Sequence, residues 1–371
     1  MEDGPSEDPE GEDPCWEMET DISDGGRGDK HILIAGPPYR GYLDQIAKAF
    51  RACDLRVSVL GWDYARRNLL QDSRFYASAS YRSKVASAQD RLNTAALEKA
   101  VERLSPDHVL VMKAAALSPR TKELCGSRGT DLVLWAYDSC REYPFIAQTA
   151  GDYDRIYTYE PNDVPELAQL GRTEYLPMGY DPGTYFPTES PEGVDTDVCF
   201  IGALRDTPVR KRMLRSVAGG LPDSSVGVWT DTIHWYSHRR LNDLRFTMGR
   251  RNIRLTRRTV DHGEINGIYN RSRVCLNVHH PQSVGALNPR TFEILGSGGL
   301  LLTDRDMAGL EGFGDGEGYS SYSTGEELVE MIRSLLGDDD LRRTMAEKGH
   351  AAATSAHTYR HRALRILRDL G

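Results

Sequence analysis

Short apolar segments alternate with helical segments in two series along this chain, and this alternation limits the possible folds more than any other feature. In the first series the sequence predicts strands at Lys30–Gly36, Arg56–Leu60, His108–Met112, Leu132–Ala136 and Tyr153–Tyr159. Helices are predicted between and after them, at about Tyr42–Cys53, 91–104, Pro119–Arg128 and Val164–Leu170. Strands that alternate with helices in this way form βαβ units, in which a parallel sheet is covered on both faces.

The second series follows a stretch without periodicity, Met178–Pro191, that is rich in Gly, Pro, Thr and Tyr. Strands are predicted at Asp197–Ile201, Ser225–Trp229, Ile253–Leu255, Val274–Val278 and Leu300–Leu302, with helices at Val209–Ala218, His262–Tyr269, 326–336, 339–353 and 357–370. We therefore predict an α/β fold of two Rossmann-like, doubly wound domains, residues 30–180 and 181–355, facing a central cleft. Ligands of such sheets bind at the C-terminal ends of the strands.

The net charge of −9 is concentrated at the N-terminus, where residues 1–30 hold twelve acidic and two basic side chains. A segment so rich in Asp, Glu, Gly and Pro buries little apolar surface, so residues 1–29 are expected to form a disordered acidic tail. The chain contains no apolar run of the ~18 residues that span a bilayer and no apolar segment of a signal peptide. A cytoplasmic protein without a transmembrane segment is expected. The six cysteines show no C-x-x-C spacing, which argues against a zinc site or a disulfide framework.

The segment Asn288–Asp304 carries the clearest candidate site. It predicts a short helix that contains Glu293, then a turn of Gly296, Ser297, Gly298 and Gly299, then an apolar strand. A carboxylate such as Glu293 can accept hydrogen bonds from two ribose hydroxyls, and the backbone amides of the small residues can bind a phosphate. The alternative is a helix C-cap followed by a core strand. Asn288 is expected to cap the helix, and Arg290 either holds a phosphate or pairs with Glu293.

Arg290-Thr-Phe-Glu293, the small-residue turn and Leu300-Leu-Leu-Thr-Asp304 resemble the nucleotide-sugar site of GT-B glycosyltransferases. The resemblance is closest to the spore-maturation CgeB-type group, which is related to the family 4 glycosyltransferases. Further segments match that group in order and spacing: Pro106–Lys113, Leu132–Asp138, Tyr175–Gly179, Val198–Gly202 and His357–Arg362. The family 4 pattern has a second Glu eight positions before Glu293, where this chain has Gly285. The resemblance therefore implies a ribose-binding role for Glu293 but not a paired-Glu site.

Basic residues follow the first strand of the second domain, in Gly202-Ala-Leu-Arg205 and Arg210-Lys211. A loop ahead of a helix N-terminus suits an anion, and the planar guanidinium group suits phosphate. The family 4 pattern implies that Arg205, together with Lys211 or Arg210, neutralises the diphosphate leaving group. For Arg210 and Lys211 the alternative is a solvated helix face.

Acceptor-side candidates follow strands of the first domain. The loop Gly36–Gly41, with Gly36, Tyr39 and Arg40, follows the first strand, and the resemblance places it near the acceptor. Asp138 follows a buried strand and could take the proton of an acceptor hydroxyl, or it could cap the next helix. Lys113 ends its strand and could meet a phosphate or an acceptor anion. His279 and His280 point in opposite directions on extended chain, so they favour loop packing over a metal site.

Taken with the resemblance, these residues predict a glycosyltransferase that moves a sugar from a nucleotide-diphosphate-sugar donor to a hydroxyl acceptor, in natural-product or polysaccharide biosynthesis. The sequence has no Asp-x-Asp motif, so no metal is expected, and neither a cofactor nor a nucleic-acid partner is expected. The resemblance implies retention of the anomeric configuration. Two other functions stay open: a nucleotide-sugar epimerase of the same fold, and a nucleotide-sugar-binding module without turnover.

Overall fold

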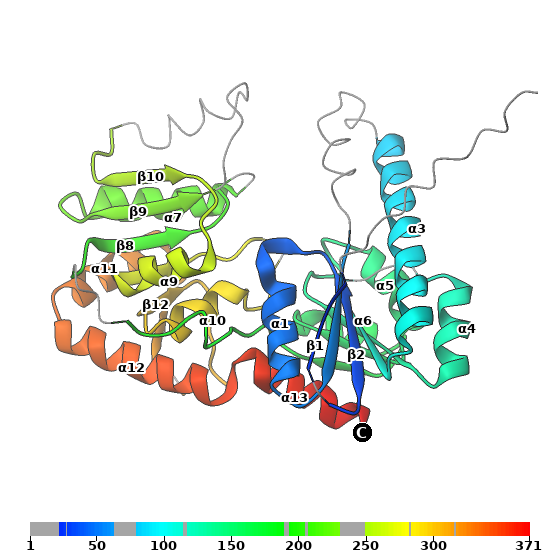
Figure 1. The fold of residues 1–371 in the computed structure, drawn as a ribbon. Coiled ribbons are helices and arrows are strands. Elements are labelled where there is room, and N and C mark those ends of the chain that lie inside the picture. The colour runs from blue at the N-terminus through cyan, green and yellow to red at the C-terminus, as the bar shows by residue number, and fades with distance from the viewer. Residues whose placement is uncertain are drawn as a thin grey trace, which may run out of the picture.

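A computed structural model of the chain describes residues 22–26, 28–62, 79–113, 117–188, 193–204, 207–230, 249–281, 283–314 and 317–371. Two α/β domains lie side by side, each built on its own sheet (Figure 1). The two predicted series of strands and helices thus form the two predicted Rossmann-like domains.

The first domain contains a seven-stranded sheet with the strand order β1-β3-β2-β4-β5-β6-β7. Its strands are β1 (Ile22–Gly25), β2 (His31–Gly36), β3 (Arg56–Gly61), β4 (His108–Met112), β5 (Asp131–Ala136), β6 (Arg155–Thr158) and β7 (Thr173–Tyr175). Its helices are η1 (Tyr39–Gly41), α1 (Tyr42–Arg51), α3 (Ala79–Leu104), α4 (Pro119–Arg128), α5 (Phe145–Thr149), η3 (Ala150–Asp152), η4 (Pro161–Asp163) and α6 (Val164–Leu167). Strands β2 to β7 pair in parallel.

The second domain contains a six-stranded parallel sheet with the order β10-β9-β8-β11-β12-β13. Its strands are β8 (Thr196–Ile201), β9 (Val226–Thr230), β10 (Ile253–Arg257), β11 (Ser272–Asn277), β12 (Leu301–Thr303) and β13 (Tyr319–Ser321). Its helices are α7 (Pro208–Gly220), α9 (His262–Asn270), α10 (Pro289–Gly296), α11 (Gly325–Leu336) and α12 (Asp339–Ala356). The short edge strands β7 and β13 were not predicted, because three residues are too few to show a pattern.

The prediction of a disordered tail up to residue 29 is wrong for Ile22–Gly25. These residues form β1, which pairs antiparallel with β3 in the register Ile22↔Leu60 to Gly25↔Val57. Composition argued against order because the segment has little apolar surface, but the edge of β3 offers backbone donors and acceptors that need no apolar side chain from the added strand. Residues 1–21 lie outside the described part.

In each sheet the strand order along the chain runs first toward one edge of the sheet and then toward the other, starting from one inner strand. The C-terminal ends of these two inner strands face each other across the domain boundary. In the first sheet β2 lies between β3 and β4, and in the second β8 lies between β9 and β11. The connections that follow the two adjacent strands where the order reverses lie on opposite faces of the sheet, so a crevice opens beyond the C-terminal ends of these strands. The loops after β2 and β8 therefore meet in the space between the domains.

The C-terminal helix α13 (Tyr359–Leu370) leaves α12 and packs against α1 of the first domain (Figure 1). Tyr359, Ala363 and Ile366 belong to the same buried apolar cluster as Ile46 and Phe50 of α1. The end of the chain thus ties the first domain to the second.

Removing β1 should destabilise the protein, whereas a start at Asp21 keeps the strand. A chain that begins at Asp29 leaves the edge of β3 without its partner strand, and we expect its Tm to fall by about 2–4 °C relative to a chain that begins at Asp21, or ~1 kcal/mol for a protein of this size. Differential scanning calorimetry of the two truncated chains measures the difference. Equal Tm values would show that β1 contributes nothing to stability.

His357, at the junction of α12 and α13, should make stability depend on pH. It is buried, its Nε2–H donates to the Glu311 carbonyl at 2.6 Å, and its Nδ1 accepts from Arg362 at 2.8 Å. Burial and the charge of Arg362 lower the pKa of His357 to about 4. The unfolded chain, with the ordinary pKa of about 6.5, then binds more protons below that pH, so stability falls as the pH drops from about 6.5 towards 4, by roughly 3 kcal/mol at most.

Urea unfolding at pH 7.5 and pH 5 tests this linkage. His357→Gln keeps a donor and an acceptor but cannot titrate, so it should lose part of the pH dependence. His350→Gln on α12 is the matched control and should keep the pH dependence of the unfolding free energy. A parental chain and a His357→Gln variant with the same pH dependence would contradict the assignment.

Candidate active site

A cavity of about 280 Å³ lies between the two domains, close to the lower end of the range of small-molecule sites, ~300–1,000 Å³. The first domain lines it with Pro37, Arg40, Tyr42, Leu43, Ile46, Met112, Tyr137, Asp138, Tyr159 and Met178. The second domain lines it with Ile201, Gly202, Ala203, Arg210, Asn277, His280, Ser283, Asn288, Pro289 and Arg290. Nine of these twenty residues end a strand or follow one within two positions, as expected for the doubly wound topology.

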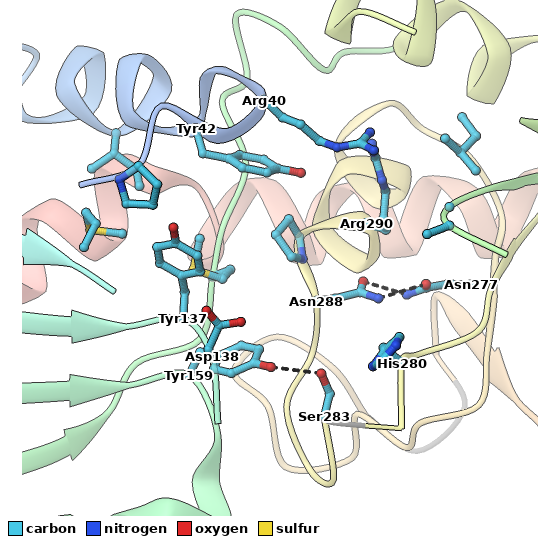
Figure 2. A pocket seen from close by; sticks show the side chains of 18 of the residues that line it. Arg40, Tyr42, Tyr137, Asp138, Tyr159, Asn277, His280, Ser283, Asn288 and Arg290 are labelled. Atoms are coloured by element: carbon cyan, nitrogen blue, oxygen red, sulfur yellow. Dashed lines mark hydrogen bonds between the residues drawn. The ribbon is translucent and has the colours of Figure 1, made fainter. Parts of the chain in front are cut away.

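Three guanidinium groups make the cavity electropositive. Figure 2 shows Arg40 of the first domain and Arg290 of the second pointing toward one another. Arg210 is buried, and its Nε donates to the Val278 carbonyl at 2.8 Å while its Nη1 donates to the Ala203 carbonyl at 2.9 Å. Among the described lining residues the one carboxylate is that of Asp138. Such a surplus of planar cations favours a phosphate-bearing ligand.

Glu293 lies behind Arg290 and does not line the cavity. Its side chain is 1% exposed, its Oε2 pairs with Arg290 at 2.5 Å, and its Oε1 accepts a hydrogen bond from the Tyr42 hydroxyl at 2.9 Å. Burial and the Glu293 charge raise the pKa of Tyr42 far above its usual value, so the phenol stays a donor. The carboxylate thus orients one side chain of each domain. The predicted contact of Glu293 with ribose hydroxyls is not compatible with this arrangement unless Tyr42 moves.

The prediction that Gly296, Ser297, Gly298 and Gly299 bind a phosphate is not supported by their position. They lie at the C-terminal end of α10, and the cavity is at its N-terminal end, about 12 Å away for eight residues. The turn closes the helix: Ser297 N donates to Glu293 O and Gly298 N donates to Leu295 O, both at 3.0 Å. Gly298 has φ +74°, as a C-terminal turn requires. A loop that precedes a parallel strand lies at the edge of the sheet opposite to the ligand.

The N-terminal end of α10 is fixed by a chain of polar side chains. Asn288 caps the helix, as predicted, by accepting from Thr291 N at 3.2 Å. It also exchanges two amide hydrogen bonds with Asn277, of 3.0 and 3.2 Å (Figure 2). The Asn288 backbone N–H donates to His279 Nε2 at 3.3 Å, and His279 Nδ1–H donates to Asp304 at 2.7 Å. Burial lowers the pKa of His279, so the ring is neutral and serves loop packing, as predicted.

On the acceptor side the structure brings Asp138 and Lys113 together. Lys113 Nζ lies 2.9 Å from Asp138 Oδ2 and 4.4 Å from the centre of the Tyr143 ring. Asp138 lines the cavity, and Lys113 does not. Gly36 is not a lining residue either: a Cβ there would lie 2.7 Å from Met112 Cβ, so this glycine permits close packing of two strand ends. Tyr39 lies in η1, and its side chain is outside the described part.

The structure places some of the predicted donor-side residues on the cavity wall and others away from it. Gly202 and Arg210 line the cavity; Lys211 lies on α7 beside them and does not. Arg205 lies outside the described residues. Lining residues that sequence reasoning did not single out are Tyr42, Tyr137, Tyr159, Asn277 and Ser283. Most of them end or follow a strand, so the sequence indicated the edge of the sheet but not which side chains point into the space.

Comparisons with known proteins agree with this architecture. Residues 210–368 match the family model described as "Glycosyl transferase-like". Among solved structures, the N-terminal domain of trehalose-6-phosphate phosphatase from Candida albicans is similar, with a TM-score of 0.68 and 10% identity over 93% of this chain and 97% of that one. No curated protein matches the sequence at a significant level.

Two further solved structures are similar over almost their whole length. They are alpha,alpha-trehalose 6-phosphate synthase from Burkholderia multivorans (TM-score 0.63, 12% identity, 92% of this chain and 98% of that one) and Anabaena HepE in complex with UDP-glucose (TM-score 0.61, 11% identity, 91% and 99%). At such identities these likenesses concern the fold. The chain has the GT-B fold, and residues 210–368, in the second domain and the C-terminal helix, carry a glycosyl transferase-like sequence.

Within the described residues, no helix is long and apolar enough to cross a membrane. No group of three or more His, Cys, Asp or Glu side chains within the same residues is arranged to hold a metal ion.

The Arg290–Glu293 pair should be important for stability because it is buried. Glu293→Gln leaves the Arg290 guanidinium without a counter-charge, and we expect a loss of about 3–5 kcal/mol of unfolding free energy. The same change in the exposed pair Arg258–Glu264, Glu264→Gln, should cost much less, because solvent screens that pair. Urea unfolding of both variants measures the contrast. Equal losses of unfolding free energy in the two variants would show that burial does not determine how much the Arg290–Glu293 pair stabilises the protein.

Proposed function

We propose that this protein is a glycosyltransferase that transfers a sugar from a nucleoside-diphosphate-sugar to a hydroxyl group of an acceptor. The observation that carries the proposal is the cavity between the two sheets, with Arg40, Arg210 and Arg290 on its wall and Asp138 at its first-domain side. The glycosyl transferase-like match of residues 210–368 supports it, as does the likeness to HepE, whose structure holds UDP-glucose.

The second domain would bind the donor. Its diphosphate would lie between Arg210, the Gly202–Ala203 loop and Arg290, where the N-terminus of α10 adds its partial positive charge. Negative charge grows on the diphosphate as the glycosidic bond breaks, and fixed cations that meet this charge lower the barrier. Arg210 is well placed for this role because two backbone carbonyls hold its guanidinium group.

The first domain would bind the acceptor. Asp138 is the lining carboxylate there, and in this proposal it accepts the proton of the attacking hydroxyl. Lys113 keeps the Asp138 side chain in place through their 2.9 Å pair. Retention of configuration and membership of the CgeB-type group are the finer parts of the proposal, and they rest on the sequence resemblance alone.

Donor binding is the first test. A panel of nucleoside-diphosphate-sugars, including UDP-glucose, should raise the Tm of the protein, because a ligand that binds only the folded state stabilises it by mass action. Titration calorimetry with the best donor should show about tenfold weaker binding, ~1.4 kcal/mol, for Arg290→Met. Arg368→Met on α13 is the control and should bind like the parent. Absence of any Tm shift across the panel would contradict the proposal.

Turnover is the second test. Asp138→Asn should lower kcat by about 10²-fold or more, with a smaller effect on donor KM, since general base catalysis contributes ~10²–10⁴-fold. The measurement is release of the nucleoside diphosphate with and without candidate acceptors. A product that is an epimer of the donor sugar and forms without any acceptor would favour the epimerase. Binding without any release would favour a binding module.

A further inference from the structure

A loop of the second domain is held by a single carboxylate of the first. The backbone N–H groups of Val284, Gly285 and Ala286 all donate to Glu160, at 2.9 Å, 2.9 Å and 3.1 Å. Glu160 follows β6 and is 1% exposed. Three consecutive backbone amides that point to one carboxylate form an anion-binding concavity, here filled by a side chain of the other domain.

The Glu160 carboxylate also accepts hydrogen bonds from a residue of its own domain. Its Oε1 accepts from the Asn162 side chain at 2.8 Å and from the Asn162 backbone N–H at 3.3 Å. A buried charge is stable only when hydrogen bonds replace the water that it has lost, and here most of the donors belong to the second domain. Separation of the domains would expose Glu160 and all three amides to water.

Two further contacts keep the loop in place. Tyr159 and Ser283 share a hydrogen bond of 2.9 Å across the domain boundary (Figure 2). Ala286 is fully buried in the apolar cluster of the first domain, which also contains Leu176 and Met178. The loop is thus inserted into the first domain, and it leads directly to Asn288 at the N-terminus of α10.

Gly285 shows that the contact is tight. A Cβ at this position would lie 2.7 Å from Asn162 Nδ2 and 3.0 Å from both Glu160 Oε1 and Pro161 Cγ. Any larger residue would therefore displace the Asn162 amide, which donates to Glu160, or push the two segments apart. This is the position at which the family 4 pattern has Glu, so the departure from that pattern has a physical reason: residues 160–162 of the first domain fill the space that a side chain would need.

We propose that Glu160 is a positioning residue of this active site: its carboxylate locks residues 284–286 onto the first domain and so fixes Asn288, Pro289 and Arg290 on the cavity wall when the domains are closed. Glu160 does not line the cavity and acts through the loop. The catalytic part of this inference rests on the proposed function, whereas the lock itself does not.

Hydrogen exchange in the absence of any ligand tests the lock. Glu160→Gln replaces one acceptor oxygen by an NH₂ group that faces backbone donors, so the amides of residues 284–286 should exchange about tenfold faster or more. Glu174→Gln on β7 is the control: it weakens ion pairs with Arg155 of the first domain and Arg365 of α13, and it should leave residues 284–286 unchanged. Unchanged exchange of residues 284–286 in Glu160→Gln overturns the proposal whatever the activity is.

A second variant leaves the carboxylate intact. Gly285→Ala inserts a methyl group 2.7 Å from Asn162 Nδ2, which is too close, so it should raise the exchange rates of the amides of residues 284–286. If Glu160→Gln proves unstable, Gly285→Ala decides the question by the same criterion: protected amides at residues 284–286 would overturn the lock.

Kinetics test the positioning role. In both variants kcat should fall about tenfold or more, while the Kd for free nucleoside diphosphate changes less than ~3-fold, because those contacts lie mostly within the second domain. A role in stability alone would lower Tm and leave kcat unchanged well below it, which would overturn the positioning role. If the parental protein neither binds nor turns over any nucleotide-sugar, the proposed function and the positioning role fail together, and the exchange experiment still decides on the lock.

Discussion

The arrangement of the cavity depends on buried carboxylates that take hydrogen bonds from the opposite domain. Glu293 of the second domain accepts from Tyr42 of the first, and Glu160 of the first accepts from three amides of the second. Each is 1% exposed, so closure removes each carboxylate from water, and the hydrogen bonds from the opposite domain compensate for the lost hydration. The closed arrangement is therefore favoured by the same bonds that place Arg290 and the start of α10.

These bonds divide the charges of the site into two groups. Apart from Asp138, the negative groups lie behind the wall: Glu293 pairs with Arg290, and Asp304 accepts hydrogen bonds from His279. Positive groups come to the surface of the cavity, as Arg40, Arg210 and Arg290 do. Because the balancing carboxylates are set back, the wall attracts an anion while every buried charge keeps a partner. This separation is the physical basis for assigning a diphosphate to the cavity.

Sequence reasoning found nearly all of the architecture, because strand and helix periodicity is a local property. The boundaries of α4 were predicted to the residue, and the strands of both sheets to within a few residues, except for the three-residue edge strands and β1. It found fewer of the site residues. Glu293 and the turn Gly296–Gly299 were expected to contact ligand because their types suit it, but residue type does not reveal which end of a helix faces the cleft.

The sequence by itself determined that two parallel α/β domains form and that ligand chemistry belongs at the C-terminal ends of their strands, since both follow from the order of apolar and helical segments. Only the tertiary structure decided how the domains are closed upon each other. The contacts of Glu160 with residues 284–286 join segments 124 to 126 positions apart. Backbone amides are the donors there, and every residue other than proline has one, so no residue pattern could mark them in advance.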